Sequence, residues 1–386
     1  MKSNSEVTID RTVEGKVLVY YFAFPHYRAG ILRALKEALG DKLDLVSGSL
    51  SRSGLKPLTE QELPILSVRP TLHLGPVSWD KHVVKPAISA KYSDVVLGPA
   101  VLSISTWTIL IGRRLLGRRT FLWGQCGQPG VRSTKRVLQE IMNRLATGLL
   151  VYGSYEETGA KELGTPSEKV HRVHNSVPMT PIEFSSEQLS EQVNRRVAAA
   201  RERGELTLVY VGRVNEDKRV DVLLSAGEIL QERYGKLSIR IIGEGPEIDS
   251  LKSQFPSVNC EFVGGIYSSE LLQEEIASAS FIIAPMKMGL LAVDALSVGV
   301  PAMVPNNPVN GSEFEALTMD VNGFSFDYGN AEDLAHQIES ALEKLSKFDA
   351  QEYFDSRAKG IHDWSPEMVA NNIVGAISGN RTGEER

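Results

Sequence analysis

Two cations follow an apolar run that has the pattern of a buried strand. The run LTLVYV (206–211) ends at Gly212, and Arg213 and Lys218 flank the start of the next helical pattern. Arginine offers paired N–H donors, lysine offers a point charge, and a helix N-terminus adds its dipole, so the combination suits a diphosphate. The alternative is a surface turn with solvated charges, because Arg and Lys are common in loops. The spacing predicts a phosphate clamp.

The stretch APMKMGLLAVDALSVGVP, residues 284–301, is typical of a backbone that passes close to a ligand. It has many small residues and ends in Gly-Val-Pro. The backbone amides of Met288, Gly289 and Leu290 lead into a helical pattern, where they can bind an anion or hydroxyl groups whatever their side chains are. Met286, at the centre of the stretch, carries no charge.

Glycines follow two further apolar runs of the second half. Gly243 and Gly245, with Pro246 after them, stand in IIGEGPEIDSLK (241–252), and they predict a turn with close backbone approach. Gly264 and Ile266 stand after the run CEFV (260–263) in the same way. The full dinucleotide fingerprint is absent from the sequence, so each of these turns is a weak signal alone.

Short apolar runs alternate with helical patterns on both sides of a polar segment at 185–205, which we take as the junction between two domains. Such alternation predicts parallel sheets covered by helices on both faces, with ligands at the carboxyl ends of the strands. We expect a helix over 28–39. Strands are expected at 16–22, 94–98, 120–123, 148–153 and 170–173, and then at 206–212, 237–243, 260–265 and 281–285.

The composition favours a two-domain protein of a reducing compartment. The 386 residues fit two domains, and two cysteines are too few for a disulfide framework. Residues 1–178 hold 24 Lys and Arg against 15 Asp and Glu, whereas residues 179–386 hold 18 against 33. This polarity suggests two domains that face different partners. No signal-peptide core and no apolar run of spanning length is present in the sequence, so we expect a cytoplasmic location.

Taken in order, the second-half motifs resemble the donor domain of retaining GT-B glycosyltransferases, most closely glycosyltransferase family 4 (glycosyl transferases group 1). That family shows strand-Gly-Arg-x4-Lys-Gly, Gly-x-Gly-Pro, Phe-x-Gly, and Glu-x7-Glu running into Ala-x-x-x-Gly-x-Pro. The resemblance covers about residues 206–345, and the first half matches more loosely through LWGQCG (122–127) and HNSVP (174–178). The matching residues are Gly212, Arg213, Lys218, Gly243, Gly245, Pro246, Phe262, Gly264, Asp294, Ala295, Gly299, Pro301, Glu313, Asn322 and Gly323.

Three departures from the family pattern bear on the site. Met286 stands in place of a glutamate that lies beside the donor sugar, and its thioether favours a deoxy or N-acetylated sugar. Asp294 replaces the glutamate that holds the ribose hydroxyls, and it is shorter by one methylene. Arg219 replaces the glycine after the lysine. Losing one charge-assisted hydrogen bond costs about 1.5–3 kcal/mol, which weakens a site without abolishing it.

The resemblance implies an α/β protein of GT-B fold, with two Rossmann-like domains facing a central cleft. Residues 1–180 would bind the acceptor and 181–360 the nucleotide sugar, while 361–386 would form a helix crossing back to the first domain and a disordered tail. The implied reaction is glycosyl transfer with retention, in surface glycan or glycoconjugate biosynthesis. Arg213 and Lys218 would perform the task of a metal, so neither metal nor cofactor is expected. A silent subunit or nucleotide-sugar-binding module, and a sugar-nucleotide epimerase or hydrolase, are the alternatives.

The acceptor side is expected at the strand ends of the first half. His26 and Arg28 stand in FPHYRAG (24–30), where the family has a Gly-rich loop, and Gln125 follows the strand at 120–123. A packed or solvated role is the alternative for His26. The seven histidines show no metal-ligand spacing, and no Asp-x-Asp motif occurs in the sequence. Cys126 lacks a convincing base partner and is interpreted as a small residue near the cleft.

A basic and partly apolar segment lies between Gly98 and Thr147. Glu140 is its only acid, and Leu115, Leu116 and the run ILIG (109–112) place apolar residues beside the arginines. Its cations are Arg113, Arg114, Arg118, Arg119, Arg132, Lys135, Arg136 and Arg144. The pattern predicts contact of the Arg113–Arg119 region with an anionic membrane or a lipid-linked acceptor, and a peripheral location on the cytoplasmic face. A solvated helix face is the alternative; no nucleic acid is expected.

Overall fold

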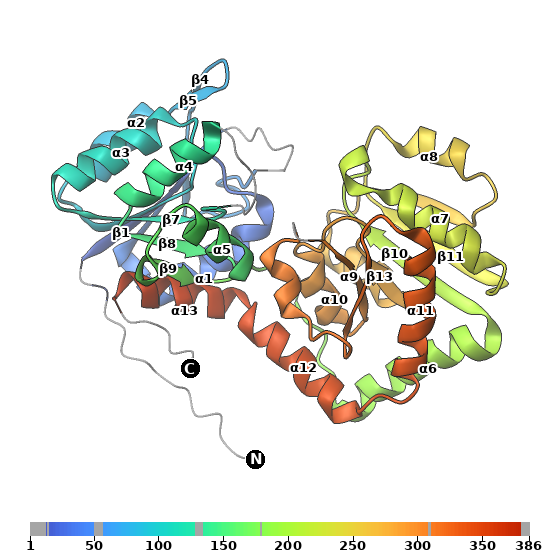
Figure 1. Ribbon diagram of the computed structural model, residues 1–386. Helices are drawn as coiled ribbons and strands as arrows, with labels where there is room; N and C mark the ends of the chain where they lie inside the picture. The colour runs from blue at the N-terminus through green and yellow to red at the C-terminus, as the bar shows by residue number, and fades with distance from the viewer. Residues whose placement is uncertain are drawn as a thin grey trace, which may run out of the picture. The chain divides into compact units, whose positions relative to one another are not determined.

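The protein divides into two compact units in the computed structural model, which describes residues 13, 15–49, 57–127, 134–177, 180–307 and 310–379. One unit comprises residues 1–174 with 366–386, and the other comprises residues 175–365. Figure 1 labels their elements. The divisions lie close to the expected boundaries of 1–180, 181–360 and 361–386. The acceptor and donor roles expected for the domains remain predictions.

The first unit is built on a seven-stranded parallel sheet in the order β3-β2-β1-β6-β7-β8-β9. Its strands are β1 (Lys16–Tyr21), β2 (Leu43–Gly48), β3 (Leu66–Arg69), β6 (Tyr92–Leu97), β7 (Arg119–Trp123), β8 (Gly148–Val151) and β9 (Val170–Arg172). A separate antiparallel pair consists of β4 (Leu72–Leu74) and β5 (Val77–Trp79).

Helices cover both faces of this sheet because successive residues of each strand point to opposite sides. Val17 and Val19 of β1 pack in one core, whereas Leu18 and Tyr20 pack in the other. The first core contains α1 (Ala29–Leu39) and α13 (Pro366–Ile377), which lie against each other from opposite ends of the chain (Figure 1). The second contains residues of α2 (Lys81–Ile88), α3 (Ile104–Leu115), α4 (Thr134–Leu145) and α5 (Ser154–Glu162).

The second unit has a six-stranded parallel sheet in the order β12-β11-β10-β13-β14-β15. Its strands are β10 (Glu205–Val211), β11 (Lys236–Ile242), β12 (Cys260–Gly264), β13 (Phe281–Ile283), β14 (Ala302–Asn306) and β15 (Gly323–Asp327). From β10 the sheet grows outward through β11 and β12 on one side and through β13 to β15 on the other. The direction of growth therefore reverses between β10 and β13, which is where ligands bind in open parallel sheets.

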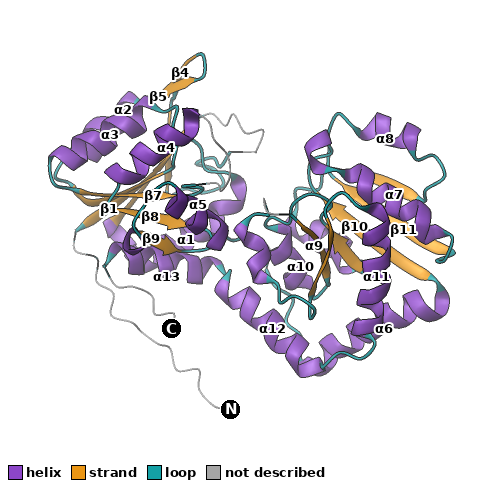
Figure 2. Ribbon diagram, in the orientation of Figure 1, coloured by secondary structure: helices purple, strands orange, loops and turns teal. Residues whose placement is uncertain are grey.

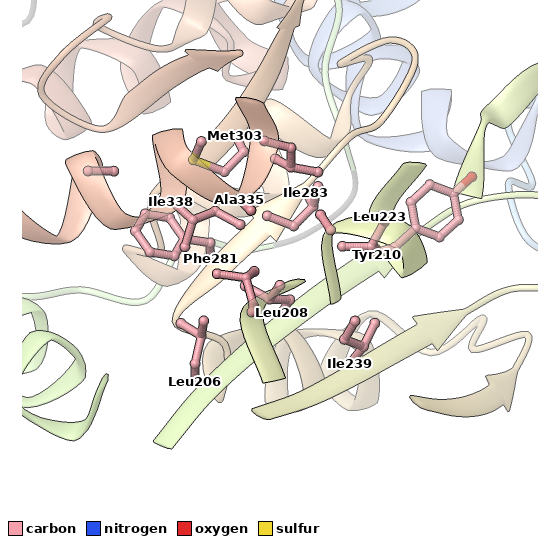
Figure 3. Packing of buried hydrophobic residues seen from close by; sticks show 14 of the residues in the cluster. Leu206, Leu208, Tyr210, Leu223, Ile239, Phe281, Ile283, Met303, Ala335 and Ile338 are labelled. Atoms are coloured by element: carbon pink, nitrogen blue, oxygen red, sulfur yellow. The ribbon is translucent and has the colours of Figure 1, made fainter. Parts of the chain in front are cut away.

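Side chains of alternate strand residues also build two cores in the second unit. Figure 3 shows one of them, where Leu208 and Tyr210 of β10 and Phe281 of β13 pack with Leu223 and Ile338 from the covering helices. The helices of the second unit, purple in Figure 2 like those of the first, are α6 (Ser186–Arg203), α7 (Val220–Gln231), α8 (Ile248–Gln254), α9 (Ser269–Ala277), α10 (Leu291–Val298), α11 (Ala331–Leu345) and α12 (Ala350–Asp363).

The sequence therefore predicted the fold class and the main strands correctly. Every expected strand is present within a residue or two of its bounds, and the expected helix over 28–39 is α1. The polar segment at 185–205 contains α6, which begins with a capping box between Ser185 and Gln188 and ends at the left-handed Gly204. The strands β2, β3, β4, β5, β14 and β15 were not expected.

Candidate functional site

The residues expected to bind a diphosphate lie on both sides of the point where strand order reverses. Arg213 and Lys218 follow β10, and the loop from Ala284 to Leu290 follows β13, the neighbouring strand. Because the sheet is parallel, both segments emerge at the same edge. The fold thus brings together two motifs that are about seventy residues apart in the sequence.

Backbone contacts join the loops that follow β10, β11 and β12. The amide of Gly212 donates to the carbonyl of Ile242 (2.9 Å), and that of Gly243 donates to Gly264 (2.8 Å). A Cβ on Gly243 would collide with the carbonyl oxygen of Gly212, and one on Gly245 would collide with that of Val214. Glycine is required at both positions because the chains approach too closely for any side chain. The expectation of close backbone approach is confirmed.

The two clamp cations have no salt-bridge partner among the described residues. Arg213 is exposed, and the hydroxyl of buried Tyr210 donates to its carbonyl oxygen at 2.7 Å, which fixes the turn. Lys218 is half-buried at the end of a 3-10 turn, Glu216–Lys218. Burial lowers the pKa of Lys218 and the charges of Arg213 and Lys287 lower it further, whereas the charge of Asp217 raises it. A pair of like charges held this way favours an anion.

Arg219, which stands where the family pattern has a glycine, adopts a backbone conformation that favours glycine. Its φ is 52°, in the left-handed region that disfavours side chains, and α7 begins directly after it. Its guanidinium pairs with Asp221 at 2.9 Å. The substitution therefore leaves the entry to α7 in place, at the cost of backbone strain.

The loop after β13 is fixed by two asparagines from the segment after β14. Asn307 Nδ2 donates to the carbonyl of Met286 at 3.0 Å, and Asn310 Oδ1 accepts from the amide of Met288 at 3.2 Å. The Met288 amide is therefore already used. The amides of Gly289 and Leu290, just before α10, donate to no residue that the structure describes. Of the three amides expected to bind a ligand, these two are available.

The predicted ribose-binding carboxyl lies in the first turn of α10. Asp294 keeps part of its surface exposed, yet the protein around its carboxyl raises the pKa from 3.8 to about 7, by desolvation. Desolvation is the one cause of this shift within the described part of the chain, and it favours the neutral form. Ile266, after β12, packs at the rim of the core beneath this edge.

A buried glutamate completes this edge of the sheet. Glu313, 7% exposed, lies in the 3-10 turn after β14. Burial raises its pKa, whereas its own amide, Lys287 and Asn175 lower it. The Asn175 side chain lies 3.5 Å from its Oε1. Sequence reasoning matched Glu313 to the family but assigned no role to it, to Lys287 or to the two asparagines; the polar cluster in NPVNGSE was the signal available.

The three acceptor-side candidates differ in how exposed their side chains are. Arg28 is buried, with its guanidinium 4.1 Å from the ring centre of Trp123 and 4.5 Å from that of Tyr21. His26 is half-buried two residues earlier, and Gln125 is exposed after β7. Arg28 thus holds the aromatic residues at this edge, and only the other two present surface. Their acceptor roles remain predictions. Cys126 is fully buried, and burial raises its pKa.

The expectation that Arg113 belongs to an exposed basic surface is wrong. Its side chain is 0% exposed, and it donates to the carbonyls of Ala87 (2.7 Å) and Arg119 (2.8 Å), among others. It therefore joins α2, α3 and β7 from inside the unit. Arg118 donates to the carbonyl of Ile88, and Arg119 pairs with Asp94. Arg114 remains exposed, and Arg132 lies outside the described residues.

Metal and membrane-spanning features were searched within the described ranges. No group of three or more His, Cys, Asp or Glu side chains there is arranged to hold a metal ion. In the same residues, no helix has the length and apolar character needed to cross a bilayer. Metal independence remains a prediction.

Comparison with known proteins finds similarity to glycosyltransferases. Residues 192–360 match the family Glycosyl transferases group 1. An uncharacterized glycosyltransferase of Methanocaldococcus jannaschii is 24% identical over 249 residues, 61% of each chain. Alpha-monoglucosyldiacylglycerol synthase of Streptococcus pneumoniae is 26% identical over 193 residues, 44% of this chain and 40% of that protein. The chain thus matches less than two thirds of the length of these curated relatives.

Solved structures show the same fold over nearly the whole chain. HepE from Anabaena, solved in complex with UDP, has a TM-score of 0.66 at 16% identity and covers 93% of this chain and 98% of its own. The lipopolysaccharide outer core galactosyltransferase WaaB has a TM-score of 0.67 at 14% identity, over 94% and 99%. Residues 192–360 are therefore similar to the family of glycosyl transferases group 1, and the two parallel sheets are those of the GT-B fold.

Proposed function

We propose that the protein transfers a glycosyl group from a nucleotide sugar to an acceptor, with retention of anomeric configuration. The observation that carries this proposal is the pair of Arg213 and Lys218 at the reversal point of the second sheet, which forms no salt bridge within the described residues. Two phosphate groups supply the negative charge that this pair lacks. Asp294 and the free amides of Gly289 and Leu290 lie on the other side of the same point, where a ribose and a sugar would follow the diphosphate.

The chain's own groups can support the reaction without a protein nucleophile. The bond between the anomeric carbon and the diphosphate oxygen breaks, and the acceptor oxygen bonds to that carbon on the face that the leaving group vacates. The proton of the acceptor passes to the departing diphosphate. Arg213 and Lys218 stabilise the charge that develops on the diphosphate, and their position is set before the reaction begins by the backbone contacts around Gly212.

The acceptor that we propose is a glycan or a lipid-linked glycan, presented at an anionic membrane on the cytoplasmic side. One relative is by name a synthase of a glucosyldiacylglycerol, and it supports this choice. The first unit carries exposed apolar stripes at helical spacing. On α3 they are Ile104 (44% exposed), Ile111 (45%) and Leu115 (81%), and on the adjacent α4 they are Val137 (57%) and Ile141 (43%).

Cations accompany these stripes. Arg114, Lys135, Lys81 and Lys85 are exposed on α3, α4 and α2. Among the described residues of these three helices Glu140 is the only acid, and it pairs with Arg144. A surface with both apolar and basic side chains suits a bilayer that contains anionic lipid, at roughly 1 kcal/mol for each cation near the headgroups. Arg113 contributes to the fold of this surface rather than to its charge.

Alanine variants of the clamp test the proposal. Arg213→Ala and Lys218→Ala are expected to lower transfer from a nucleotide sugar by about 100- to 1,000-fold, the typical effect of losing leaving-group stabilisation of about 3–4 kcal/mol. The matched control is Lys236→Ala, which removes a lysine paired with Glu205 at the opposite edge of the same sheet. Circular dichroism should show folded protein in all three. Near-normal turnover in both clamp variants would refute the phosphate assignment.

Product analysis separates this function from its alternatives. Transfer to an acceptor supports the proposal, whereas free sugar indicates a hydrolase and an altered sugar nucleotide indicates an epimerase. Binding of nucleotide sugars with no turnover for any acceptor in a panel of lipid-linked and soluble glycans indicates a silent subunit. The substitution of Met286 for a carboxylate is the observation that keeps the silent alternative open.

A further inference from the structure

The hairpin of β4 and β5 is separate from both main sheets, and it projects beyond the helices of the first unit (Figure 1). Gly75, at a φ of 58°, and Pro76 turn the chain between its two strands. The amide of Ser78 in β5 donates to the carbonyl of Leu102, just before α3, at 3.0 Å. This bond ties β5 to the rest of the unit, so the hairpin is a fixed projection.

One face of the hairpin is apolar from its base to its tip. The strand register pairs Leu72 with Trp79 and Leu74 with Val77, and side chains at such alternate positions lie on the same face. Leu72 is 54% exposed and Leu74 is 74% exposed. Several apolar side chains gathered on one exposed face mark an interaction surface rather than the scatter of single residues that any protein shows.

The order of side chains along the hairpin matches the order of layers at a bilayer surface. The aliphatic pair stands at the tip, and the pair that contains half-buried Trp79 is about 7 Å further back, at a rise of about 3.4 Å per residue. Arg69, at the end of β3, and Lys81, at the start of α2, are exposed and flank the hairpin in the sequence. Aliphatic groups prefer the acyl chains, tryptophan prefers the interface, and cations prefer the headgroups.

The charge around the hairpin is complementary to anionic headgroups. Residues 66–91, all of which the structure describes, contain one acid, Asp80. Its side chain is buried, and its carboxylate accepts from the hydroxyls of Tyr20 and Thr71. In the same segment Lys85 is exposed, as are the two flanking cations. No exposed acid of this segment therefore opposes an anionic surface.

The hairpin also adjoins the apolar stripe of α3. Leu102, whose carbonyl accepts from β5, is 37% exposed, and Ile104 at the start of α3 is 44% exposed. The hairpin thus extends the surface for which we proposed contact with a membrane.

We propose that the β4–β5 hairpin inserts into the interfacial region of a bilayer that contains anionic lipid, with Leu74 deepest and Trp79 at the interface. This inference rests on the membrane contact in the proposed function and assigns to that contact an element that enters the bilayer. A second copy of the chain is the alternative occupant of the apolar face. Charge disfavours it, because two hairpins paired through this face bring the flanking cations of both copies together.

Tryptophan fluorescence tests the insertion. The chain has four tryptophans, of which Trp123 and Trp364 are buried, and the indole of half-buried Trp107 donates to the carbonyl of Val101 at 3.0 Å. Vesicles of phosphatidylcholine with phosphatidylglycerol should shift the emission to shorter wavelengths, and lipids brominated on their acyl chains should quench it. Trp79→Phe should remove both changes. Vesicles of phosphatidylcholine alone should cause neither.

Serine variants measure how much the hairpin contributes to vesicle binding. Leu74→Ser is expected to weaken co-sedimentation with the anionic vesicles about 10- to 100-fold, the effect of withdrawing one leucine side chain from apolar surroundings. Leu72→Ser should weaken it at least about threefold, since Leu72 is less exposed. The matched control is Leu271→Ser on α9 of the second unit, where the leucine is 56% exposed, and it should change nothing. None of these variants alters the net charge.

Each result either supports or overturns the proposal. Vesicle binding that survives Leu74→Ser, with unchanged emission from Trp79, overturns it and leaves membrane contact through α3 and α4 standing. Self-association in ultracentrifugation that Leu74→Ser removes, without any change in vesicle binding, assigns the hairpin to a second copy and also overturns it. Absence of binding to every vesicle overturns the hairpin and the membrane acceptor together. Glycosyl transfer itself is tested by the clamp variants, whose result does not depend on vesicles.

Discussion

Asp294→Asn is expected to stabilise the protein at pH 8 while weakening donor binding. The pKa of Asp294 is raised from 3.8 to about 7 by desolvation, so the folded state binds this proton more tightly than the unfolded state. The stability that the neutral carboxyl provides is fully present below about pH 4 and is lost as the pH rises to about 7. A tenfold change in proton affinity is worth about 1.4 kcal/mol, so the ionised carboxylate costs about 4 kcal/mol at pH 8. Asparagine avoids this cost.

Urea unfolding of the two proteins at pH 8 and pH 5 measures the effect. The stability gap should be about 4 kcal/mol at pH 8 and below about 2 kcal/mol at pH 5, since the wild-type carboxyl is then largely protonated in the folded state. Glu313→Gln is the control for the other carboxyl at this edge whose pKa is raised by burial. It should leave the gap between wild type and Asp294→Asn unchanged.

The pH dependence of donor binding provides a second measurement of the ionisation of Asp294. If the ribose hydroxyls bind ionised Asp294, affinity follows its ionised fraction, which falls about tenfold from pH 8 to pH 6 when the pKa is about 7. A nucleotide sugar is the proper ligand, because the terminal phosphate of a nucleoside diphosphate itself titrates near a pKa of about 6. In Asp294→Asn the affinity should be lower and independent of pH. Equal stability of the two proteins at pH 8, with wild-type affinity equal at pH 6 and pH 8, would refute this reasoning.

Three further outcomes are expected from the fold and from the surface of the first unit. Arg113→Met should lower the free energy of unfolding, measured in urea, by about 3–5 kcal/mol, because several buried carbonyls lose their hydrogen-bond donor. Arg114→Gln is the control and should change the free energy of unfolding by less than about 0.5 kcal/mol. Gly243→Ala should abolish nucleotide binding in calorimetry by pushing its loop off the Gly212 carbonyl, and unaltered affinity would contradict the close approach. In co-sedimentation, vesicles should bind the protein only when they contain anionic lipid, less at high salt, and less after Arg114→Gln with Leu115→Gln. Equal binding to neutral vesicles would favour a soluble acceptor.

The sequence predicted the donor-side features because they depend on local patterns. A strand followed by Gly-Arg and a lysine at fixed spacing determines where Arg213 and Lys218 lie once β10 forms. The strand order that brings this turn beside the loop at Met286 is a long-range property, and only the parallel βα alternation hinted at it. Strands β14 and β15 were missed because VPN and FSFD are short and polar at their ends.

Burial explains the largest error. Arg113 and Arg114 are adjacent and of the same type, and charge counting treated them alike. One residue is 100° further round the helix than the other, so Arg113 points into the unit while Arg114 faces solvent. The interior position of Arg113 is stabilised by carbonyls at the ends of α2 and β7, two segments that no local sequence pattern connects. Arg28 in its aromatic surroundings is a second case of the same kind.

The electrostatics of the second unit bear on whether the site is in use. Lys218 is kept near Arg213 and partly out of water, and Asp294 is kept where its charged form is disfavoured. Both arrangements reduce the stability of the protein without ligand, and neutral residues at either position would raise it. A nucleotide sugar reverses both costs, because its phosphates compensate the cations and its ribose hydroxyls bind the carboxylate. Substitutions that stabilise a protein are easy to reach when no function opposes them. The presence of both costs, together with a clamp intact at Gly212, Arg213 and Lys218, therefore favours a working donor site.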